Sequence, residues 1–389
     1  MPFLQYKNGL TLSPLTVDPD QLPIFLVPGI MGNGRELYEL AEALDKQRDH
    51  KTPIFIYDES ELADDSLLQL SLDELADKML QEIIEITNDA KFDIQLAGYS
   101  SGAIIGSILS RKLCENGLEP HLVVIDQPDM TSVAQYINQD SHSLMQDLIN
   151  VVNAAARLSG LSEIKFTEKQ VDVARNYLEL EARFNQLADT LLRAQQEITE
   201  QQRNTFADYL ARAKRNLNYP DDKVTPSKIS STHLILTKET AVKYGASEES
   251  WKEYQGGWAK RSNQLVTHRS DLLDDKSHLE LLTGDCAVEI ARIVSESLRQ
   301  DPEKLFNKYI DVLQKSFAEQ KRRNKTDSAP TPSIHQNPVL TTSMIRTSGT
   351  LFSQFNTGDH TKRHSNAPEP KNPVKIESAE SPKSNVCAV

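Results

Sequence analysis

The chain has 389 residues, of which 38% are hydrophobic and 25% are charged, and its formal net charge at pH 7 is −13. No apolar run reaches the roughly 18 residues that a membrane-spanning helix needs, so the sequence predicts no transmembrane segment. The N-terminus has no basic region followed by an apolar one, so we expect no secretory signal peptide either.

Composition also limits which binding partners and which cellular compartment we expect for the protein. Residues 1–320 are more acidic than the whole chain, because residues 321–389 carry ten Lys or Arg against five Asp or Glu. An acidic body repels phosphate backbones, so we expect no nucleic-acid partner. Cys114, Cys286 and Cys387 lack the spacing of a disulfide framework or a thiolate zinc site, which favours a cytoplasmic protein. We expect no metal and no cofactor. The oligomeric state stays open.

Short apolar runs and helical patterns alternate over the first 130 residues, which is typical of a parallel sheet covered by helices. Ser71 and Glu74 have the spacing of a capping box at the start of one of these helices. The predicted strands are residues 23–27, 53–57, 92–97 and 121–125, and the predicted helices are residues 35–44, 72–87 and 101–114. This alternation indicates the α/β class.

The pattern changes after residue 130. Residues 131–218 are mostly helical, with Leu187 and Leu191 at helical spacing, and predict a helical lid inserted into the fold. Further strands are predicted at residues 232–237 and 265–268, and further helices at residues 286–298 and 302–317. We therefore expect one domain over residues 1–320.

Residues 321–389 are rich in Ser, Thr, Asn and Pro and poor in apolar side chains. Such a segment cannot bury enough apolar surface to offset its conformational entropy, so we expect a disordered tail. Its end, residues 385–389, leaves open an export signal beside a plain disordered extension. In either case we expect the tail to take no part in catalysis.

Residues 98–102 read Gly-Tyr-Ser-Ser-Gly, a GxSxG motif at the junction of a predicted strand and a predicted helix. In this context a sharp turn exposes a serine hydroxyl above the sheet edge, and small residues at Gly98 and Gly102 avoid clashes. We therefore predict that Ser100 is a nucleophile. The Ser101 backbone amide, at the positive end of the following helix, would then face an oxyanion.

A serine hydroxyl needs a base to take its proton, and the base needs a carboxylate to fix its tautomer. In folds with this motif the chain order is serine, acid, histidine. Asp126 follows the next predicted strand and is the leading acid, with Glu239 as the alternative. His278 lies in a polar loop after the last predicted strands and is the leading base, with His268 as the alternative.

A second oxyanion donor is expected in the loop after the strand at residues 23–27. Residues 28–32 read Pro-Gly-Ile-Met-Gly, and the glycines allow the backbone to approach a substrate oxygen. The Ile30 amide is the predicted donor, and the Met31 amide is the alternative.

Taken together, these residues resemble the thioesterase domains that end nonribosomal peptide and polyketide assembly lines. The resemblance is carried by residues 12–15 (LSPL), 23–29 (PIFLVPG), 71–76 (SLDELA), 98–102 (GYSSG) and, near the lid exit, 204–219. The family's acid follows the strand after the motif, which favours Asp126. Its base precedes a Leu-Leu pair, as His278 precedes Leu281 and Leu282. The resemblance implies an α/β-hydrolase fold with a mostly parallel sheet.

The chain departs from this family in its long helical insertion, in Ala103 where a second glycine is common, and in the lack of a fused carrier domain. The resemblance therefore implies a freestanding serine acyl-thioesterase that hydrolyses or transfers acyl groups. The acyl group would be borne by an acyl or peptidyl carrier protein, on phosphopantetheine, or by coenzyme A. For an acidic carrier, Arg212, Lys214 and Arg215 form a candidate basic patch.

Two other functions fit the same residues. One is a lipid or ester hydrolase or acyltransferase that uses the same triad. The other is a catalytically silent binding module with a hydrolase fold. Oxygen-ester substrates would separate the first from a thioesterase, and covalent labelling of the serine would exclude the second.

Overall fold

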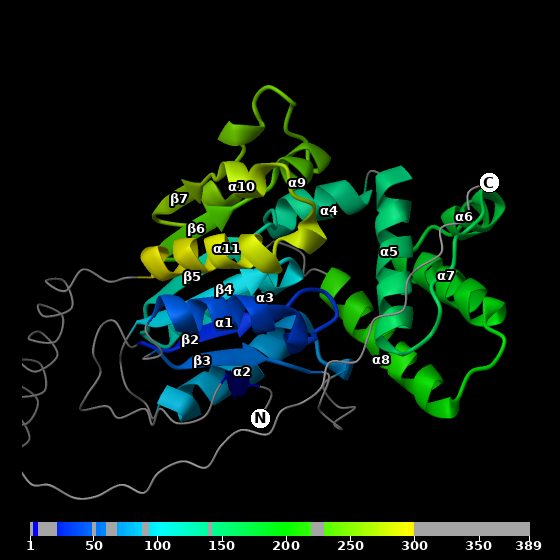
Figure 1. Cartoon of the computed structure of the whole chain (residues 1–389), viewed down its shortest axis with the longest axis horizontal. Helices are drawn as coiled ribbons and strands as arrows, with labels where there is room; N and C mark the ends of the chain where they lie inside the picture. Colours follow the sequence, from blue (N-terminus) through cyan, green and yellow to red (C-terminus); the bar gives the residue numbers. More distant parts are fainter. Residues whose placement is uncertain are drawn as a thin grey trace, which may run out of the picture. The chain divides into compact units, whose positions relative to one another are not determined.

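The computed structural model describes residues 3–6, 22–48, 52–59, 68–87, 93–138, 142–218 and 229–298 (Figure 1). The predicted helix at residues 302–317 and the predicted disordered tail at residues 321–389 lie outside the described residues.

Within this part of the chain, seven strands form one sheet in the order β1-β3-β2-β4-β5-β6-β7. They are β1 (Phe3–Tyr6), β2 (Ile24–Val27), β3 (Ile54–Tyr57), β4 (Ile94–Tyr99), β5 (Pro120–Ile125), β6 (Ser231–Ile235) and β7 (Leu265–His268). β1 pairs with β3 in the antiparallel direction, and every other pair is parallel. β2, β3 and β4 are buried along their whole length, as expected for parallel strands covered on both faces.

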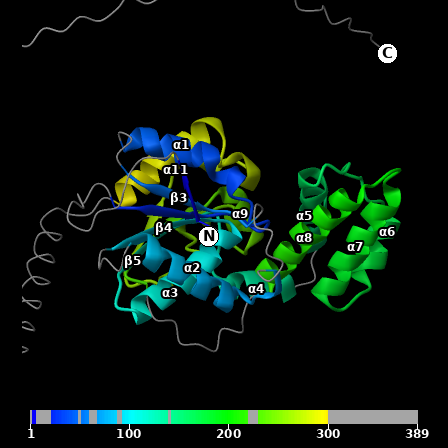
Figure 2. The same cartoon turned by 90° about the horizontal axis from the view of Figure 1, so that it is seen from below.

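Two pairs of helices cover the two faces of the sheet (Figure 2). On one face, α1 (Tyr38–Gln47) and α11 (Gly284–Ser297) share a buried apolar cluster with one set of strand side chains. On the other face, α2 (Leu72–Thr87) and α3 (Ser101–Glu115) share a second cluster with the alternate set. The core therefore consists of two apolar layers separated by the sheet.

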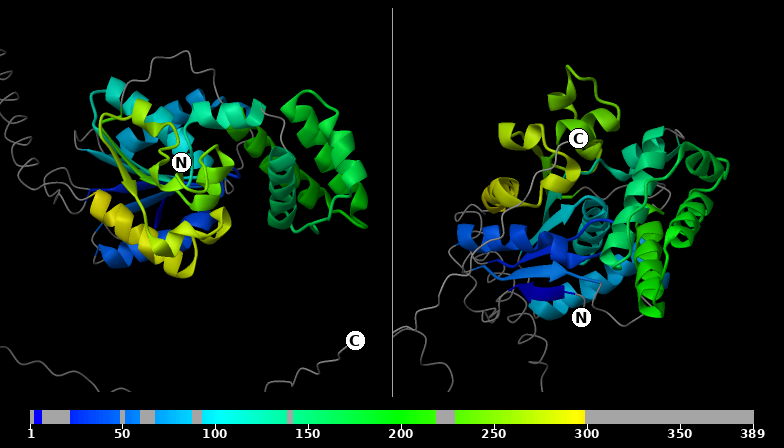
Figure 3. Two further views of the ribbon diagram at one scale, coloured as in Figure 1. Left: turned by 90° about the horizontal axis from the view of Figure 1, so that it is seen from above. Right: turned by 45° about the vertical axis from the view of Figure 1, so that its right-hand side comes forward.

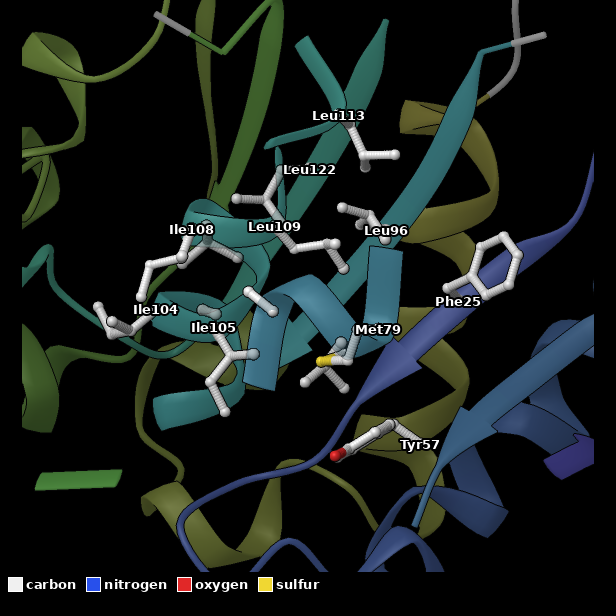
Figure 4. Close-up of a cluster of buried hydrophobic side chains, with 14 of the residues drawn as sticks. Phe25, Tyr57, Met79, Leu96, Ile104, Ile105, Ile108, Leu109, Leu113 and Leu122 are labelled. Carbon is white, nitrogen blue, oxygen red and sulfur yellow. The ribbon is translucent and has the colours of Figure 1, made fainter. Parts of the chain in front are cut away.

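The layer under α2 and α3 shows how side chains from both helices meet the strands. In Figure 4, Met79 of α2 and Leu109 of α3 lie beside Leu96 of β4. Ser71 and Glu74 start α2 as the sequence predicts. The Ser71 backbone N–H donates to Glu74 Oε2 at 2.8 Å, and the Glu74 N–H donates to Ser71 Oγ at 3.3 Å. This capping box is confirmed.

The predicted helical insertion is confirmed. It consists of α4 (Met130–Asn138), α5 (His142–Leu158), α6 (Glu168–Arg175), α7 (Leu180–Ala194) and α8 (Glu200–Leu217). These helices share an apolar cluster of their own, which includes Met31 from the loop after β2. In both views of Figure 3, α5 to α8, drawn in green, form a group beside the sheet. We refer to α4 to α8 as the lid.

The structure also holds elements that the sequence analysis did not predict. β1 adds an antiparallel strand at the sheet edge, and the helix expected at residues 35–44 begins as a 3-10 helix, η2 (Gly34–Leu37). After β6 come the helices α9 (Lys238–Lys243) and α10 (Asp271–Asp274) and the 3-10 helices η4 (Trp251–Glu253), η5 (Trp258–Lys260) and η6 (His278–Glu280).

The strand order, the helices on both faces and the turn between β4 and α3 together define the α/β-hydrolase fold. The fold class predicted from the sequence is thus confirmed. Among the helices of the described segments, none is both long enough and apolar enough to cross a membrane.

Candidate active site

The turn between β4 and α3 holds Ser100 in a strained conformation. Its φ of 53° and ψ of −134° lie outside the regions that residues with a side chain normally adopt. A Cβ atom built on Gly98 would lie 2.5 Å from the Ala103 Cα, and one on Gly102 would lie 2.3 Å from the Pro28 carbonyl oxygen. Glycine is therefore required on both sides of Ser100, as the motif predicts.

Asp126 lies at the carboxyl end of the neighbouring strand, directly after β5. It too has a positive φ, of 55°, and its backbone N–H donates to the Ile235 carbonyl oxygen at 2.8 Å. The residue is only 1% exposed. Its Oδ1 accepts from the Thr237 N–H at 2.7 Å and its Oδ2 from the Thr240 hydroxyl at 2.8 Å. The hydrogen bonds from Thr237 and Thr240 thus hold the carboxyl group in place independently of any imidazole.

His278 begins η6 and reaches this carboxyl group. Its Nδ1 lies 2.8 Å from Asp126 Oδ2, a geometry in which the imidazole N–H donates to the carboxylate. Burial would raise the pKa of Asp126, but the hydrogen bonds from His278, Thr237 and Thr240 and the nearby imidazole outweigh it and hold that pKa below its usual value. Asp126 is therefore ionised at neutral pH.

Tyr99 holds the imidazole beside the serine turn. The Tyr99 and His278 rings stack with centroids 4.7 Å apart, and the Tyr99 hydroxyl donates to the His278 carbonyl oxygen at 2.8 Å. Tyr99 directly precedes Ser100. The interactions found for the described residues include no hydrogen bond between the Ser100 hydroxyl and His278. Such contacts are often long in free enzymes and tighten with substrate.

The structure also places the two alternatives from the sequence. Glu239 lies in the first turn of α9, whereas Asp126 is the carboxylate that contacts His278. His268 lies in β7, where its Nε2 is 2.9 Å from the Nδ1 of His233. The geometry therefore favours Asp126 and His278 over these alternatives.

The loop after β2 offers backbone amides near Ser100. The Gly32 N–H donates to the Gly29 carbonyl oxygen at 3.0 Å, and the Gly29 N–H donates to the carboxylate of Glu36. For the amides of Ile30, Met31 and Ser101, no acceptor is found in the described part of the chain. Ser101 is also the first residue of α3, where backbone N–H groups carry partial positive charge. These amides remain the candidate oxyanion donors.

Sequence reasoning missed Glu36, which lies in η2. Burial, the largest influence, raises its pKa to about 7 against the effects of the Gly29 N–H and His278. In the sequence Glu36 is a polar position of an amphipathic helix, and nothing in that pattern distinguishes it from a solvated residue.

The end of α8 contacts the same loop. The Asn216 side-chain amide donates to the Ile30 carbonyl oxygen at 2.9 Å, and Asn216 is only 1% exposed. The guanidinium of the preceding residue, Arg215, donates to Glu59 Oε1 at 2.8 Å, and that of Arg212, one turn earlier, donates to the Glu59 carbonyl oxygen at 3.0 Å. We call these three α8 residues with Glu59 the α8 clamp. It ties the lid to the candidate oxyanion loop.

The α8 clamp corrects one expectation from the sequence. Arg212 and Arg215 are buried against Glu59 and do not form an exposed basic patch. The Nζ of Lys214, the third residue of the expected patch, lies 3.6 Å from Glu181 Oε1. The closeness of three basic residues in the sequence suggested an exposed basic surface. In the structure, the buried carboxylate of Glu59, more than 150 positions earlier in the chain, pairs with two of them, Arg212 and Arg215.

A cavity of 820 Å³ opens within the lid and not beside Ser100. It lies between α5 and α6, and its lining includes His142, Phe166 and Arg175. Within the described ranges, no group of three or more His, Cys, Asp or Glu side chains could hold a metal ion.

We compared the chain with known proteins. The chain is similar to solved structures at low identity, and no functionally curated protein matches it. One is a four-domain nonribosomal peptide synthetase bound to AMP and glycine, with 17% identity and a TM-score of 0.48; the match covers 71% of this chain and 19% of that one. The chain thus spans about a fifth of that protein.

Two others are the type II thioesterase BorB from the borrelidin biosynthetic cluster and an α/β-hydrolase enzyme from a Medee basin deep-sea metagenome library. BorB is 14% identical, with 77% of this chain and 96% of BorB covered and a TM-score of 0.43. The metagenome enzyme is also 14% identical; the match covers 77% of this chain and 94% of that enzyme, with a TM-score of 0.45. A family model described as "Thioesterase domain" matches residues 22–248. Because this match spans more than half of the chain, the protein belongs to the thioesterase domain family.

Proposed function

We propose that the chain hydrolyses acyl thioesters with Ser100 as nucleophile, His278 as base and Asp126 as the carboxylate that orients the base. The observation that carries this proposal is the 2.8 Å contact between His278 Nδ1 and Asp126 Oδ2, made beside the strained serine by residues 152 positions apart. Membership of the thioesterase domain family supports the substrate class.

In the first half of the reaction, the Ser100 oxygen attacks the thioester carbonyl carbon while His278 Nε2 takes the hydroxyl proton. The carbonyl oxygen becomes an oxyanion, which accepts hydrogen bonds from the Ser101 amide and from the amide of Ile30, or alternatively of Met31. The ionised Asp126 carboxylate stabilises the imidazolium form of His278.

In the second half, the carbon–sulfur bond breaks and the acyl group stays on Ser100 as an ester. A thiolate is a good leaving group, so this step needs little help from a general acid. The departing sulfur takes the proton that His278 received from Ser100 and leaves as a thiol, so the imidazole is neutral again. Water then attacks the ester carbonyl and gives its proton to His278, and the collapse of the second oxyanion returns the proton to Ser100 and releases the acid. Another nucleophile in place of water would transfer or cyclise the acyl group.

The substrate of this proposal is an acyl group on a phosphopantetheine arm, either of an acyl or peptidyl carrier protein or of coenzyme A. Both carriers present the same thioester. Since the two arginines of the expected basic patch are buried against Glu59, a carrier protein would have to bind elsewhere on the chain.

The test is hydrolysis of acyl-coenzyme A and acyl-carrier substrates by the full chain and by Ser100→Ala. We expect Ser100→Ala to lower kcat by at least about 10⁴-fold. Ser247→Ala, a serine change at an exposed loop after α9, is the matched control and should be unaffected. Equal rates for Ser100→Ala and the wild type would refute the proposal.

Two further measurements separate the alternative functions. Faster turnover of oxygen esters than of thioesters with the same acyl chain would favour a lipid or ester hydrolase. A fluorophosphonate probe should label the wild type and not Ser100→Ala. A wild-type chain that the probe does not label would favour a catalytically silent binding module.

A further inference from the structure

A second carboxyl group lies next to the candidate nucleophile. The Glu36 Oε1 accepts a hydrogen bond from the Gly29 backbone N–H. A Cβ atom built on Gly29 would lie 3.1 Å from Glu36 Oε1 and 3.4 Å from Ser100 Cβ. The carboxyl group and the serine therefore flank the same face of Gly29, and because that residue has no side chain, no atom of it fills the space between them.

The second oxygen of this carboxyl group is the one available to a substrate. Among the residues that the structure describes, the Gly29 amide is the one hydrogen-bond partner found for Glu36. An N–H donates most favourably to a carbonyl-type oxygen. A protonated Glu36 would therefore keep Oε1 as the acceptor and carry its proton on Oε2, where an O–H donor becomes available.

The charges around Glu36 determine how much of it is protonated. Asp58 after β3, His278 of η6 and Tyr99 of β4 are the titratable groups that face it. Burial has the largest effect and raises the pKa of Glu36, the Gly29 N–H and His278 lower it, and Asp58 raises it slightly; together they bring this pKa to about 7. Near neutral pH, both the neutral and the ionised forms are populated.

Only one of these two forms is compatible with an oxyanion at this place. A carboxylate beside the tetrahedral intermediate would repel its negative charge, and the repulsion is strong where water is excluded. A neutral carboxylic acid would donate a hydrogen bond to the same oxygen. Enzymes do use a protonated carboxyl group in this way when an apolar environment keeps it neutral.

We propose that Glu36, as a neutral carboxylic acid, is a catalytic residue that donates a hydrogen bond to the oxyanion beside the backbone amides of Ser101 and Ile30. This proposal rests on the thioester hydrolysis proposed above. The proton stays on Glu36 throughout, and the proton of Ser100 still passes to His278. Glu36 therefore adds electrostatic stabilisation and no proton-transfer step.

This role predicts an alkaline limb in the pH profile. As pH rises through about 7, Glu36 loses its proton, the donor disappears and a negative charge takes its place, so kcat should fall. In a triad without such a donor, kcat would stay level above the pKa of the base. The alkaline limb is therefore the signature of Glu36.

The experiment measures kcat and KM from pH 5.5 to 9 for the wild type, Glu36→Gln, Glu36→Ala and the control Glu42→Gln. Gln keeps a carbonyl oxygen for the Gly29 N–H and an amide donor for the oxyanion, but it cannot ionise. Glu42 lies in α1 and pairs with Lys46 at an exposed position. Thermal unfolding of each variant, monitored by circular dichroism, checks that it is folded.

We expect Glu36→Gln to stay within about threefold of the wild-type kcat at pH 6 and to lose the alkaline limb, so that its kcat exceeds the wild-type value about tenfold at pH 8.5. Glu36→Ala should lower kcat at pH 6 by about 100-fold with little change in KM, as expected when one oxyanion donor is lost. Glu42→Gln should follow the wild type at every pH.

Three results would overturn the proposal. If Glu36→Gln is inactive while folded, the ionised carboxylate is the working form and Glu36 acts as a base. If Glu36→Gln keeps the alkaline limb, or if Glu36→Ala keeps the wild-type kcat, Glu36 has no part in binding the oxyanion.

A second measurement separates this proposal from the proposed function. The rate of fluorophosphonate labelling depends on Ser100 and on the stabilisation of a phosphonyl oxygen, and it requires no thioester. A wild type that labels but hydrolyses no thioester refutes the substrate class, and the pH profiles of labelling for the wild type and Glu36→Gln then decide the Glu36 proposal. A wild type that neither labels nor hydrolyses would overturn both.

Discussion

The two ends of the candidate site hold a carboxyl group in opposite ways. Behind the imidazole, Asp126 accepts hydrogen bonds from the Thr237 N–H, the Thr240 hydroxyl and His278. At the oxyanion end, Glu36 accepts one hydrogen bond, from Gly29, within the described residues. Burial penalises the ionised form of both groups, but three donors lower the pKa of Asp126, whereas one donor leaves the pKa of Glu36 raised to about 7.

The opposite pKa shifts of Asp126 and Glu36 match the charge that the proposed reaction requires at each position. In the proposed reaction, negative charge behind the imidazole would stabilise the imidazolium that forms when Ser100 loses its proton. Negative charge beside the oxyanion would oppose the same transition state. Burial, hydrogen-bond donors and nearby charges thus favour a different charge on each carboxyl group, and each charge suits a different role in the proposed reaction.

The strongest test of the comparison is Asp126→Asn. Asn keeps an oxygen for the Thr237 N–H and nearly the same volume, but its amide cannot act as the negative acceptor for the imidazole N–H. His278 then adopts the wrong tautomer, and kcat for thioester hydrolysis should fall by about 10³-fold to 10⁴-fold. Asp172→Asn, an exposed change on α6, is the matched control. A nearly unchanged kcat in folded Asp126→Asn would show that hydrolysis does not depend on the negative charge of Asp126.

The next test compares how each carboxyl group links stability to pH. The Glu36 pKa is raised from 4.5 to about 7, so the folded state binds more protons than the unfolded state in this range, and the free energy of unfolding falls as pH rises through it. Asp126 has a lowered pKa, so its contribution is present above its unfolded pKa and is lost as pH falls through its folded pKa. The two pH slopes have opposite signs.

Urea unfolding from pH 3 to 8.5 measures both slopes. From pH 4.5 to 7, the wild type should lose stability relative to Glu36→Gln by at most about 3 kcal/mol, an upper limit because Glu36 is partly exposed. Below about pH 4, the wild type should lose stability relative to Asp126→Asn. If stability changed with pH in the same direction for Glu36 and for Asp126, the two carboxyl groups would not have pKa values shifted in opposite directions.

The α/β-hydrolase fold and the order of its first elements were predictable from the sequence, because buried strands and amphipathic helices have strong local patterns. The same holds for the turn around Ser100, since the glycines on both sides of it are required by backbone clashes. β1 could not be predicted in this way, because a four-residue edge strand carries too little pattern. The catalytic roles of Ser100, Asp126 and His278 remain predictions.

Glu36 and the α8 clamp could not be predicted, for a different reason. Their properties depend on contacts between distant parts of the chain and not on local pattern. Glu36 occupies a polar helical position, and its raised pKa arises from burial beside Gly29. Arg212 and Arg215 follow the ordinary pattern of a solvated helix face, but both are buried against Glu59, which lies in the loop after β3.

The smallest expected effect concerns the α8 clamp, which supports the oxyanion end alone. Asn216→Ala removes the hydrogen bond to the Ile30 carbonyl oxygen and so loosens the loop that carries the Ile30 amide. We expect kcat to fall by about threefold to tenfold, the range for one hydrogen bond, with KM unchanged, because oxyanion contacts act mainly in the transition state.

Asn153→Ala is the matched control for this change. Asn153 makes the same kind of contact within the lid, since its side-chain amide donates to the Ile164 carbonyl oxygen at 3.1 Å and its oxygen accepts from the Ile164 N–H at 3.1 Å. It should cost somewhat less stability, because Asn153 is partly exposed whereas Asn216 is buried, and it should not lower kcat. If the two variants lower kcat equally, the lid acts on catalysis through its overall stability. If only Asn216→Ala lowers kcat, the contact with Ile30 positions the oxyanion loop.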